Sequence, residues 1–305
     1  MSRNWIGIDL GGTKVEGAVV REDGTVLFRH RLPTQRELGY DHVLRRVHEV
    51  YTRCAAEAGV PPVVGIGTPG SESIRTGLMK NCNTTCLNGR PLRADLERQL
   101  GLPVVLENDA NLFAWAEAMW GAACGYEWVF GVILGTGVGG GLVWRGRIWP
   151  GAQRIAGEWG HHRIAAEGEE CYCGQRGCVE TFLCGPALER RAAARRGVAA
   201  AVPEVVAAAR RGEPAACAVL EEYLDCFGRA LANVVNIVDP SCIVLGGGLS
   251  NIDELYTRGR EAVARYVFND GFDTPLVRHA LGDSAGVIGA AMLAAGVTKN
   301  GGRIA

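Results

Sequence analysis

The sequence lacks the apolar segments that carry a chain across or out of a membrane. No apolar run reaches the roughly 20 residues that a membrane-spanning helix needs. The first apolar stretch is interrupted by Asp9, so we do not expect the opening residues MSRNWIGIDLGG to form a secretory leader. The sequence also has no large excess of charge of either sign, because 32 Lys and Arg nearly balance 33 Asp and Glu and leave a net charge of −1. We therefore expect no nucleic acid and no membrane as partner.

Paired cysteines are a second missing feature. The chain has 11 cysteines, an odd number, and we expect no leader that would take it to an oxidising compartment. We expect a cytoplasmic protein in which some cysteines are free and some bind a metal. What the sequence does have is length and glycine: 305 residues fit two domains, and 43 glycines indicate loops where the backbone comes close to a ligand.

Hydrophobic periodicity predicts an α/β fold whose two halves repeat one theme. Each half opens with a strand, a glycine loop and a second strand. The predicted strands cover residues 4–9, 15–20, 25–32, 63–70, 104–109, 128–134, 141–148 and 242–250. The predicted helices cover residues 41–58, 91–100, 110–120, 186–212, 214–236 and 251–267, with a small-residue helix near the C-terminus.

The stretch ILGTGVGGGLVWRG (133–146) holds six glycines and formally contains G-x-G-x-x-G. A dinucleotide site is excluded by context, because its loop must open a helix, whereas GLVWRGRI alternates like a strand. A Walker loop is excluded as well, since IDLGGTK lacks the four-residue spacer before Gly-Lys.

Both loops can still hold phosphate, because successive glycines let backbone N–H groups point into one concavity. Thr13 and Thr136 add hydroxyl donors at matching positions, and Asp9 can order the water shell of a Mg²⁺ that bridges the phosphates. The competing interpretation is that each loop is only a hairpin turn. The predicted nucleotide-binding residues are Asp9, Gly11, Gly12, Thr13, Lys14, Gly135, Thr136, Gly137, Gly247 and Gly248.

Four segments in this order resemble the sugar kinase, actin and heat-shock-70 superfamily, and within it the ROK family of bacterial sugar kinases. They are IGIDLGGTK, ILGTGVGGG, IVLGGGLSN and GDSAGVIGAA. The resemblance implies two ribonuclease-H-like domains with ATP and sugar in a central cleft, and the adenine near Gly246–Leu249. The expected domains are residues 1–117 plus about 289–305, and residues 118–288.

In LENDAN, a carboxylate at the end of a strand is suited to accept the proton of a sugar hydroxyl during phosphoryl transfer. Asp109 could instead merely cap the following helix, and local sequence does not separate the two interpretations. The resemblance favours the first, because Asp109 matches the catalytic aspartate of ROK kinases.

GEWGHH and CYCGQRGCVE supply three thiols and an imidazole, enough for a closed tetrahedral zinc site. The predicted ligands are His161, Cys171, Cys173 and Cys178, with His162 as the competing ligand and unliganded buried thiols as the alternative. We expect structural zinc that fixes the loop bearing Glu158, His161 and Glu180. We also expect the second ring nitrogen of His161 to donate to a sugar hydroxyl.

The resemblance implies a ring of sugar-binding side chains: Asn83, Asn108, Asp109, Glu158, His161 and Glu180. Asn83 could also be an ordinary turn residue, and Cys82 and Cys86 leave the pocket shape undefined. KNxNxTxLNG (80–89) resembles the fructokinase and mannokinase branch, so the expected reaction is conversion of D-fructose to fructose 6-phosphate by a homodimer.

Alternatives within the family are a kinase for N-acetylglucosamine, N-acetylmannosamine or glucose. A sugar-sensing repressor needs a helix-turn-helix before the first predicted phosphate loop, and we expect none here. An actin-like assembly protein would explain neither the zinc cluster nor LENDAN.

Overall fold

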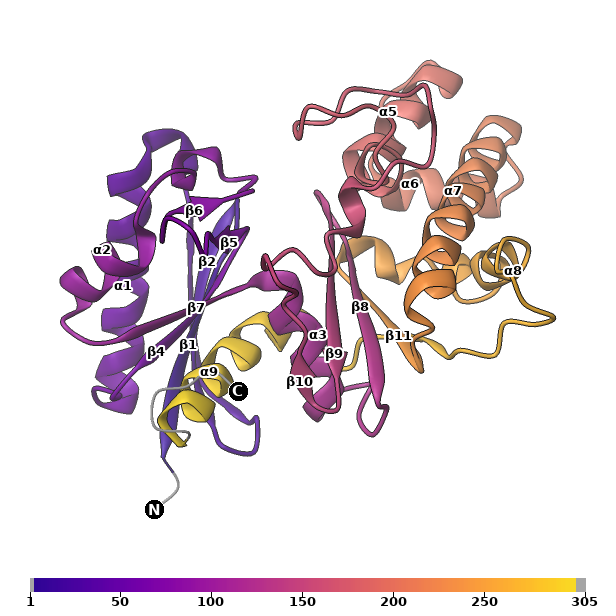
Figure 1. Ribbon diagram of the computed structural model, residues 1–305. Coiled ribbons are helices and arrows are strands. Elements are labelled where there is room, and N and C mark those ends of the chain that lie inside the picture. Colours follow the sequence, from indigo (N-terminus) through magenta and orange to yellow (C-terminus); the bar gives the residue numbers. More distant parts are fainter. Residues whose placement is uncertain (1–2, 300–305) are drawn as a thin grey trace. The chain divides into compact units, whose positions relative to one another are not determined.

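The computed structural model describes residues 3–299 and divides into two compact units (Figure 1). The first unit comprises Met1–Gly121, Gly146–Ala156 and Leu281–Ala305, and the second comprises Ala122–Arg145 and Gly157–Ala280. The prediction gave residues 118–121, 146–156 and 281–288 to the second domain, whereas they belong to the first unit. Residues 300–305, which the prediction gave to the first domain, lie outside the described residues.

The first unit is built on a five-stranded mixed sheet with the order β3-β2-β1-β4-β7. Its antiparallel part is β1 (Asn4–Leu10), β2 (Lys14–Arg21) and β3 (Val26–Pro33), while β4 (Val64–Thr68) and β7 (Val104–Asn108) run parallel to β1. The carboxyl ends of β1, β4 and β7 therefore meet at one edge of the sheet, which is where open α/β sheets bind ligands.

Helices cover both faces of this sheet. On one face lie α1 (Tyr40–Ala58) and α2 (Leu92–Leu100), and α9 (Ala285–Lys299) runs beside β1 on the other, next to α3 (Asp109–Trp120) (Figure 1). The α9 backbone comes so close that a Cβ at Gly7 would lie 2.1 Å from the Val287 carbonyl oxygen, and one at Gly65 would lie 1.8 Å from that of Ala290. Small residues in GVIGAAMLAAG thus allow the helix to sit directly on the strands.

The second unit repeats this plan. Four of its strands run in the order β9-β8-β11-β12. An antiparallel hairpin is formed by β8 (Trp128–Leu134) and β9 (Val138–Trp144), and β11 (Cys242–Gly246) and β12 (Leu276–Arg278) are parallel to β8. The helices of this unit are α4 (Glu180–Leu183), α5 (Gly185–Arg196), α6 (Val202–Arg210), α7 (Pro214–Val238) and α8 (Arg258–Ala264).

Two predicted helices were too long. The helix expected over 186–212 is divided into α5 and α6, because Gly197 ends α5 with a φ of 73° and Pro203 begins α6 in its first turn. The helix expected over 251–267 is reduced to α8, which follows two 3₁₀ turns. Three short strands have no counterpart in the prediction: β5 (Ser71–Glu72), β6 (Met79–Lys80) and β12. A fourth short strand, β10 (Arg147–Ile148), corresponds to the last two residues of the predicted strand 141–148.

None of the helices among residues 3–299 combines the length and the apolar character required to cross a membrane.

Candidate functional site

The first predicted phosphate loop is a tight turn between β1 and β2. The N–H of Gly11 donates to the Lys14 carbonyl oxygen over 2.9 Å, and the Thr34 hydroxyl donates to the Gly11 carbonyl oxygen over 2.7 Å. A Cβ at Gly12 would lie 3.2 Å from the Arg36 guanidinium and 3.7 Å from Oδ1 of Asn83. These two hydrogen bonds hold the turn closed. The exposed Asn83 lies beside the turn.

Asp9 stands at the edge where the parallel strands end. Its neighbours across the sheet are Gly67 on β4 and, one strand further, Glu107 on β7. A Cβ at Gly67 would lie 3.5 Å from one Asp9 carboxylate oxygen, and a Cβ at Gly286 would lie 3.1 Å from the other. Glycine at both positions therefore leaves room around the carboxylate. This room, and the hard oxygen donors, fit a hydrated Mg²⁺.

The environment of Asp9 disfavours its charge. The side chain is partly buried, and loss of hydration raises its pKa from 3.8 to about 6. Lys14 and Arg31 oppose this shift of the Asp9 pKa, and Glu16 adds to it. A bound cation would restore the ionised form.

Lys14 is engaged by acids of its own unit. Its ammonium lies 3.4 Å from the buried Glu16 carboxylate and 3.9 Å from that of Asp283. Glu16 also pairs with Arg29 and Arg31. Sequence reasoning placed Lys14 at the nucleotide and missed this cluster, because charges on adjacent strands come together only through the β2–β3 register.

At the end of β7, two adjacent side chains accept hydrogen bonds from the first backbone N–H groups of α3. Asn108 is the N-cap of α3, and its Oδ1 accepts from the N–H of Ala110 and of Asn111 over 3.0 and 3.2 Å. Asp109 is the first residue of the helix, and its Oδ1 accepts from the Ala110 N–H over 2.8 Å. The alternative interpretation of LENDAN made Asp109 the cap of the following helix. In the structure, the N-cap of α3 is Asn108.

The second predicted phosphate loop joins β8 to β9 with a similar closure, as the N–H of Gly135 donates to the Gly137 carbonyl oxygen over 2.9 Å. The Glu180 carboxylate accepts from the Val138 N–H over 3.0 Å, directly after the loop. Gly247 has a φ of 80°, and a Cβ there would lie 2.3 Å from the Leu134 carbonyl oxygen. The structure thus brings the loop 135–137, the turn 247–248 and Glu180 together at one edge of the second sheet.

Glu158 and His161 frame a 3₁₀ turn, Trp159–His161, that packs on β9. Indole Nε1 of Trp159 donates to the Gly139 carbonyl oxygen over 2.9 Å, and a Cβ at Gly160 would lie 2.3 Å from the Val138 carbonyl oxygen. This close packing fixes the turn relative to Glu180, which bonds the same strand. Glu158, His161 and Glu180, three of the predicted sugar-binding residues, are therefore all held in place by contacts with β9.

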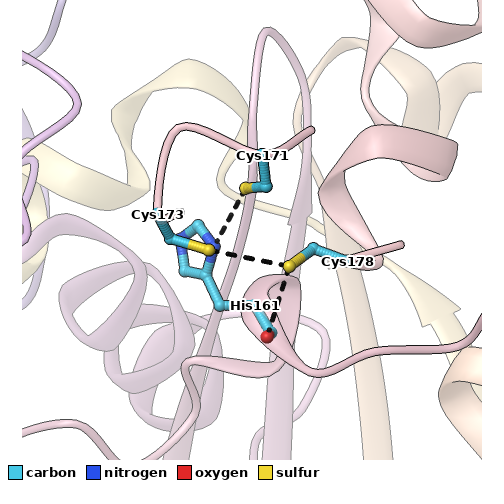
Figure 2. Close-up of side chains that lie close together, drawn as sticks. All are labelled: His161, Cys171, Cys173 and Cys178. Atoms are coloured by element: carbon cyan, nitrogen blue, oxygen red, sulfur yellow. Dashed lines mark hydrogen bonds between the residues drawn. The ribbon is translucent and has the colours of Figure 1, made fainter. Parts of the chain in front are cut away.

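Figure 2 shows the side chains of His161, Cys171, Cys173 and Cys178 directed toward one another. Their ligand atoms all lie within 4.8 Å of each other. Nδ1 of His161 is 3.5 Å from the Cys171 sulfur, and the sulfurs of Cys173 and Cys178 are 3.6 Å apart (Figure 2). A tetrahedral zinc with Zn–S bonds of about 2.3 Å separates two sulfurs by about 3.8 Å, so the cluster fits that ion.

The competing ligand His162 is directed elsewhere. Its Nε2 lies 3.3 Å from the Asn233 amide nitrogen, and burial lowers its pKa. His161, in contrast, has both nitrogens engaged. Nδ1 faces the sulfurs, and Nε2 lies 3.0 Å from the Tyr172 hydroxyl. Sequence reasoning assigned this second nitrogen to the sugar and missed Tyr172, because the residue between two clustered cysteines carries no signal of its own.

The loop 80–89, which carries the KNxNxTxLNG pattern, is held by Asn88. Its amide bonds both the N–H and the carbonyl oxygen of Cys82, at 2.9 and 3.0 Å. Cys82 itself is buried in the core, where a Cβ at Gly70 would lie 2.7 Å from its sulfur. Cys86 packs partly buried against the same core.

Comparison with known proteins shows the family. The ROK family model matches residues 5–297. N-acetyl-D-glucosamine kinase of Escherichia coli O6:H1 is 36% identical over 299 residues, which cover 95% of this chain and 98% of that protein. The ROK hexokinase of Thermus thermophilus has a TM-score of 0.84 at 37% identity and covers 97% of this chain and 99% of that one.

A ROK family glucokinase from Streptomyces griseus, solved with glucose and AMPPNP, has a TM-score of 0.83 at 30% identity, over 95% of this chain and 98% of that one. The hexokinase-type α/β fold with two sheets predicted from sequence is confirmed by these structures. With a family match over nearly its whole length, this chain belongs to the ROK family and is an ATP-dependent sugar kinase.

Proposed function

We propose that this kinase phosphorylates the 6-hydroxyl of a hexose of gluco configuration, either N-acetyl-D-glucosamine or D-glucose. The observation that carries the proposal is the 36% identity to an N-acetyl-D-glucosamine kinase across almost the full length of both chains. The glucokinase at 30% identity, solved with glucose, supports the same ring configuration. The relatives described here give no support to fructose, the substrate expected from KNxNxTxLNG.

Asp109 is the proposed general base. Its carboxylate accepts the proton of the sugar hydroxyl while that oxygen attacks the γ-phosphorus of ATP. The new P–O bond forms as the bond to the β-phosphate oxygen breaks, and ADP leaves with the electron pair. Support comes from the position of Asp109 directly after β7, as the first residue of α3, with Asn108 as the N-cap of that helix.

Backbone N–H groups and hydroxyls of the two hairpin loops are the proposed phosphate donors, from Gly11–Lys14 and Gly135–Gly137. Gly247 and Gly248 are proposed to border the nucleoside. Asp9 would hold the water shell of Mg²⁺, and that ion, when bound, supplies charge neutralisation on the phosphates.

Glu158, His161 and Glu180 are the proposed sugar contacts of the second unit, and Asn83 and Asn108 those of the first. Paired carboxylates and amides suit hydroxyls, which both donate and accept. The proposed role of zinc on the four clustered ligands is to hold the loop that carries these residues, since a site with four protein ligands has no open position for phosphate. A homodimer also stays a prediction.

The test is an ADP-release assay with D-glucose, N-acetyl-D-glucosamine, N-acetyl-D-mannosamine, D-mannose and D-fructose at equal concentrations. We expect the highest kcat/KM for one of the two gluco sugars. A higher kcat/KM for fructose than for both would contradict the proposal and restore the fructokinase assignment. Absence of turnover with all five sugars would remove the hexose kinase activity altogether.

A further inference from the structure

A cavity of about 270 Å³ lies within the first unit, beside the end of β7. Its lining residues come from β7, α3, the segment 146–154 and the C-terminal half of α9. The walls are mostly apolar and include Trp115, Ile148 and Leu293. The volume is just below the range of about 300–1,000 Å³ that is typical of ligand pockets, so a small molecule would fit. None of the predicted sugar-binding or nucleotide-binding residues lines this cavity.

Three charged side chains line the cavity: Glu107, Arg147 and Arg154. Oε1 of Glu107 accepts from the Asn108 N–H over 2.8 Å and from the Asn111 side-chain amide over 2.9 Å. Arg147 and Arg154 form no ion pair and no side-chain hydrogen bond with any of residues 3–299. Each guanidinium therefore keeps its N–H donors for another partner. Two unpaired cations beside one hydrogen-bonded acid favour a ligand with a negative charge.

The backbone of Arg154 is a second, independent indication of a ligand. Its φ is 55°, in the left-handed region that favours glycine. The Arg154 N–H donates to the Gly151 carbonyl oxygen over 3.2 Å, and the Ser71 hydroxyl donates to the Arg154 carbonyl oxygen over 3.1 Å, so this conformation is fixed. Glycine would adopt it without strain, whereas the arginine side chain gains no hydrogen bond or ion pair within the described residues. Strained residues of this kind gather at ligand sites.

We propose that this cavity binds a small organic anion, distinct from the hexose and from ATP. Its charged group, a carboxylate or a phosphate monoester, pairs with Arg147 and Arg154. Its apolar body packs against Trp115 and Leu293, where burial of apolar surface adds affinity. The site goes beyond the proposed function, and its test needs no turnover, so either can fail without the other.

Fluorine NMR titration of the full chain, without sugar or nucleotide, tests the ligand class. The probes are para-fluorobenzoate, para-fluorophenyl phosphate and the neutral para-fluorobenzamide. We expect a Kd of about 1 mM or lower for one of the two anions, which identifies the charged group, and a Kd at least about 10-fold higher for the amide. Inorganic phosphate at the same concentration should not displace the bound anion. Equal binding of the amide, or displacement by inorganic phosphate, would overturn the proposed ligand class.

Two variants locate the bound anion. Arg154→Gly removes a guanidinium and suits the left-handed backbone, so the Kd should rise at least about 10-fold while the unfolding temperature does not fall. Gly296→Leu fills the cavity from α9, because a Cβ at Gly296 would meet no atom within 4 Å. Binding should be lost in this variant as well. The matched control is Arg53→Gln, which removes an exposed guanidinium from α1 in the same unit and should leave the Kd unchanged.

Three results would overturn the site. Neither anion binding to wild type with a Kd below about 10 mM would remove it. Full affinity in both Arg154→Gly and Gly296→Leu would place the anion elsewhere on the protein. An equal loss in Arg53→Gln and Arg154→Gly would reduce the interaction to general attraction by positive charge.

Discussion

The two glycine hairpins are alike in backbone and different in what stands beside them. In the first unit the Gly11 N–H closes on the Lys14 carbonyl, and in the second the Gly135 N–H closes on the Gly137 carbonyl, both over 2.9 Å. The first hairpin follows Asp9, whose neighbours on the sheet lead across to the end of β7 and Asp109. The second is bonded to Glu180, in the segment that also carries the Cys–His cluster.

This difference suggests a division of labour on a duplicated scaffold. Both sheets have an antiparallel hairpin followed by two parallel strands, so each can offer a phosphate loop. The acids proposed for the metal ion and for proton transfer belong to the first unit, and the zinc loop and most sugar contacts belong to the second. Variants of the two acids Asp9 and Asp109 in the first unit should therefore change kcat, and variants of the sugar contacts in the second unit should change sugar affinity.

The largest effect is expected from Asp109→Asn, which keeps the size of the side chain and removes the base. We expect kcat to fall by about 10²–10⁴-fold with sugar KM nearly unchanged. The matched control is Asp41→Asn, which removes an exposed acid from the first turn of α1 in the same unit. A similar loss in both variants would assign the effect to the helix terminus and contradict the base.

Asp9→Asn should lower kcat by about 100-fold and at the same time stabilise the protein without nucleotide. Because the pKa of Asp9 is raised from 3.8 to about 6, its contribution to stability is present at low pH and is lost as pH rises through 6. Above that pH the ionised carboxylate costs about 1–3 kcal/mol, a range reduced because the side chain is only partly buried.

Thermal unfolding at pH 5 and pH 8 measures this gain, which should be larger at pH 8. The control Asp23→Asn should give none, because a hydrogen bond from Thr25 lowers the pKa of Asp23 and favours its charged form. An Asp9→Asn protein less stable than wild type at pH 8 would show that the carboxylate is a structural partner instead.

Removal of the metal should lower the thermal stability of the protein and weaken the sugar contacts of the second unit. We expect Cys178→Ser to lose its zinc and to unfold about 5–10 °C lower, with a raised sugar KM. Cys217→Ser is the control, since its sulfur bonds the Ala209 carbonyl oxygen far from the cluster in sequence and shares no ligand with it. Wild type purified without chelator and free of zinc would contradict the metal assignment.

The smallest effect is expected from Glu180→Gln. The amide oxygen can still accept from the Val138 N–H, so the fold is retained, while the charged acceptor for a sugar hydroxyl is lost. Sugar KM should rise about 10-fold with a smaller change in kcat. An unchanged KM would limit Glu180 to supporting the loop, and the same assay with Glu204→Gln, at the start of α6, controls for the loss of a carboxylate.

Much of the fold was predictable because local patterns and tertiary structure agree. Alternating strands around glycine turns predicted β1–β2 and β8–β9, and the small residues of GVIGAAMLAAG predicted the helix α9, although not its close packing. The cysteine spacing placed three sulfurs and His161 within one cluster. Prediction was weaker where a break lies inside a helical pattern, as at Gly197, which ends α5 in a left-handed conformation.

Contacts that depend on how separate strands and loops come together in the fold could not be predicted from the sequence. Glu16 meets Arg29 and Arg31 only because β2 pairs with β3, and Tyr172 meets His161 only because the cluster folds its loop back. The choice of Asn108 over Asp109 as helix cap depends on where α3 begins, to within one residue. The substrate was harder still, since the fructose assignment came from the loop motif KNxNxTxLNG, and Cys82, which left the pocket shape undefined, is buried in the core.

The most direct test of the division of labour is one measurement of kcat and sugar KM for Asp109→Asn and Glu180→Gln side by side, with the preferred hexose of the wild type. We predict that Asp109→Asn loses kcat at nearly constant KM and that Glu180→Gln raises KM at nearly constant kcat. The opposite pattern, with the loss of kcat in Glu180→Gln and the loss of affinity in Asp109→Asn, would contradict the account.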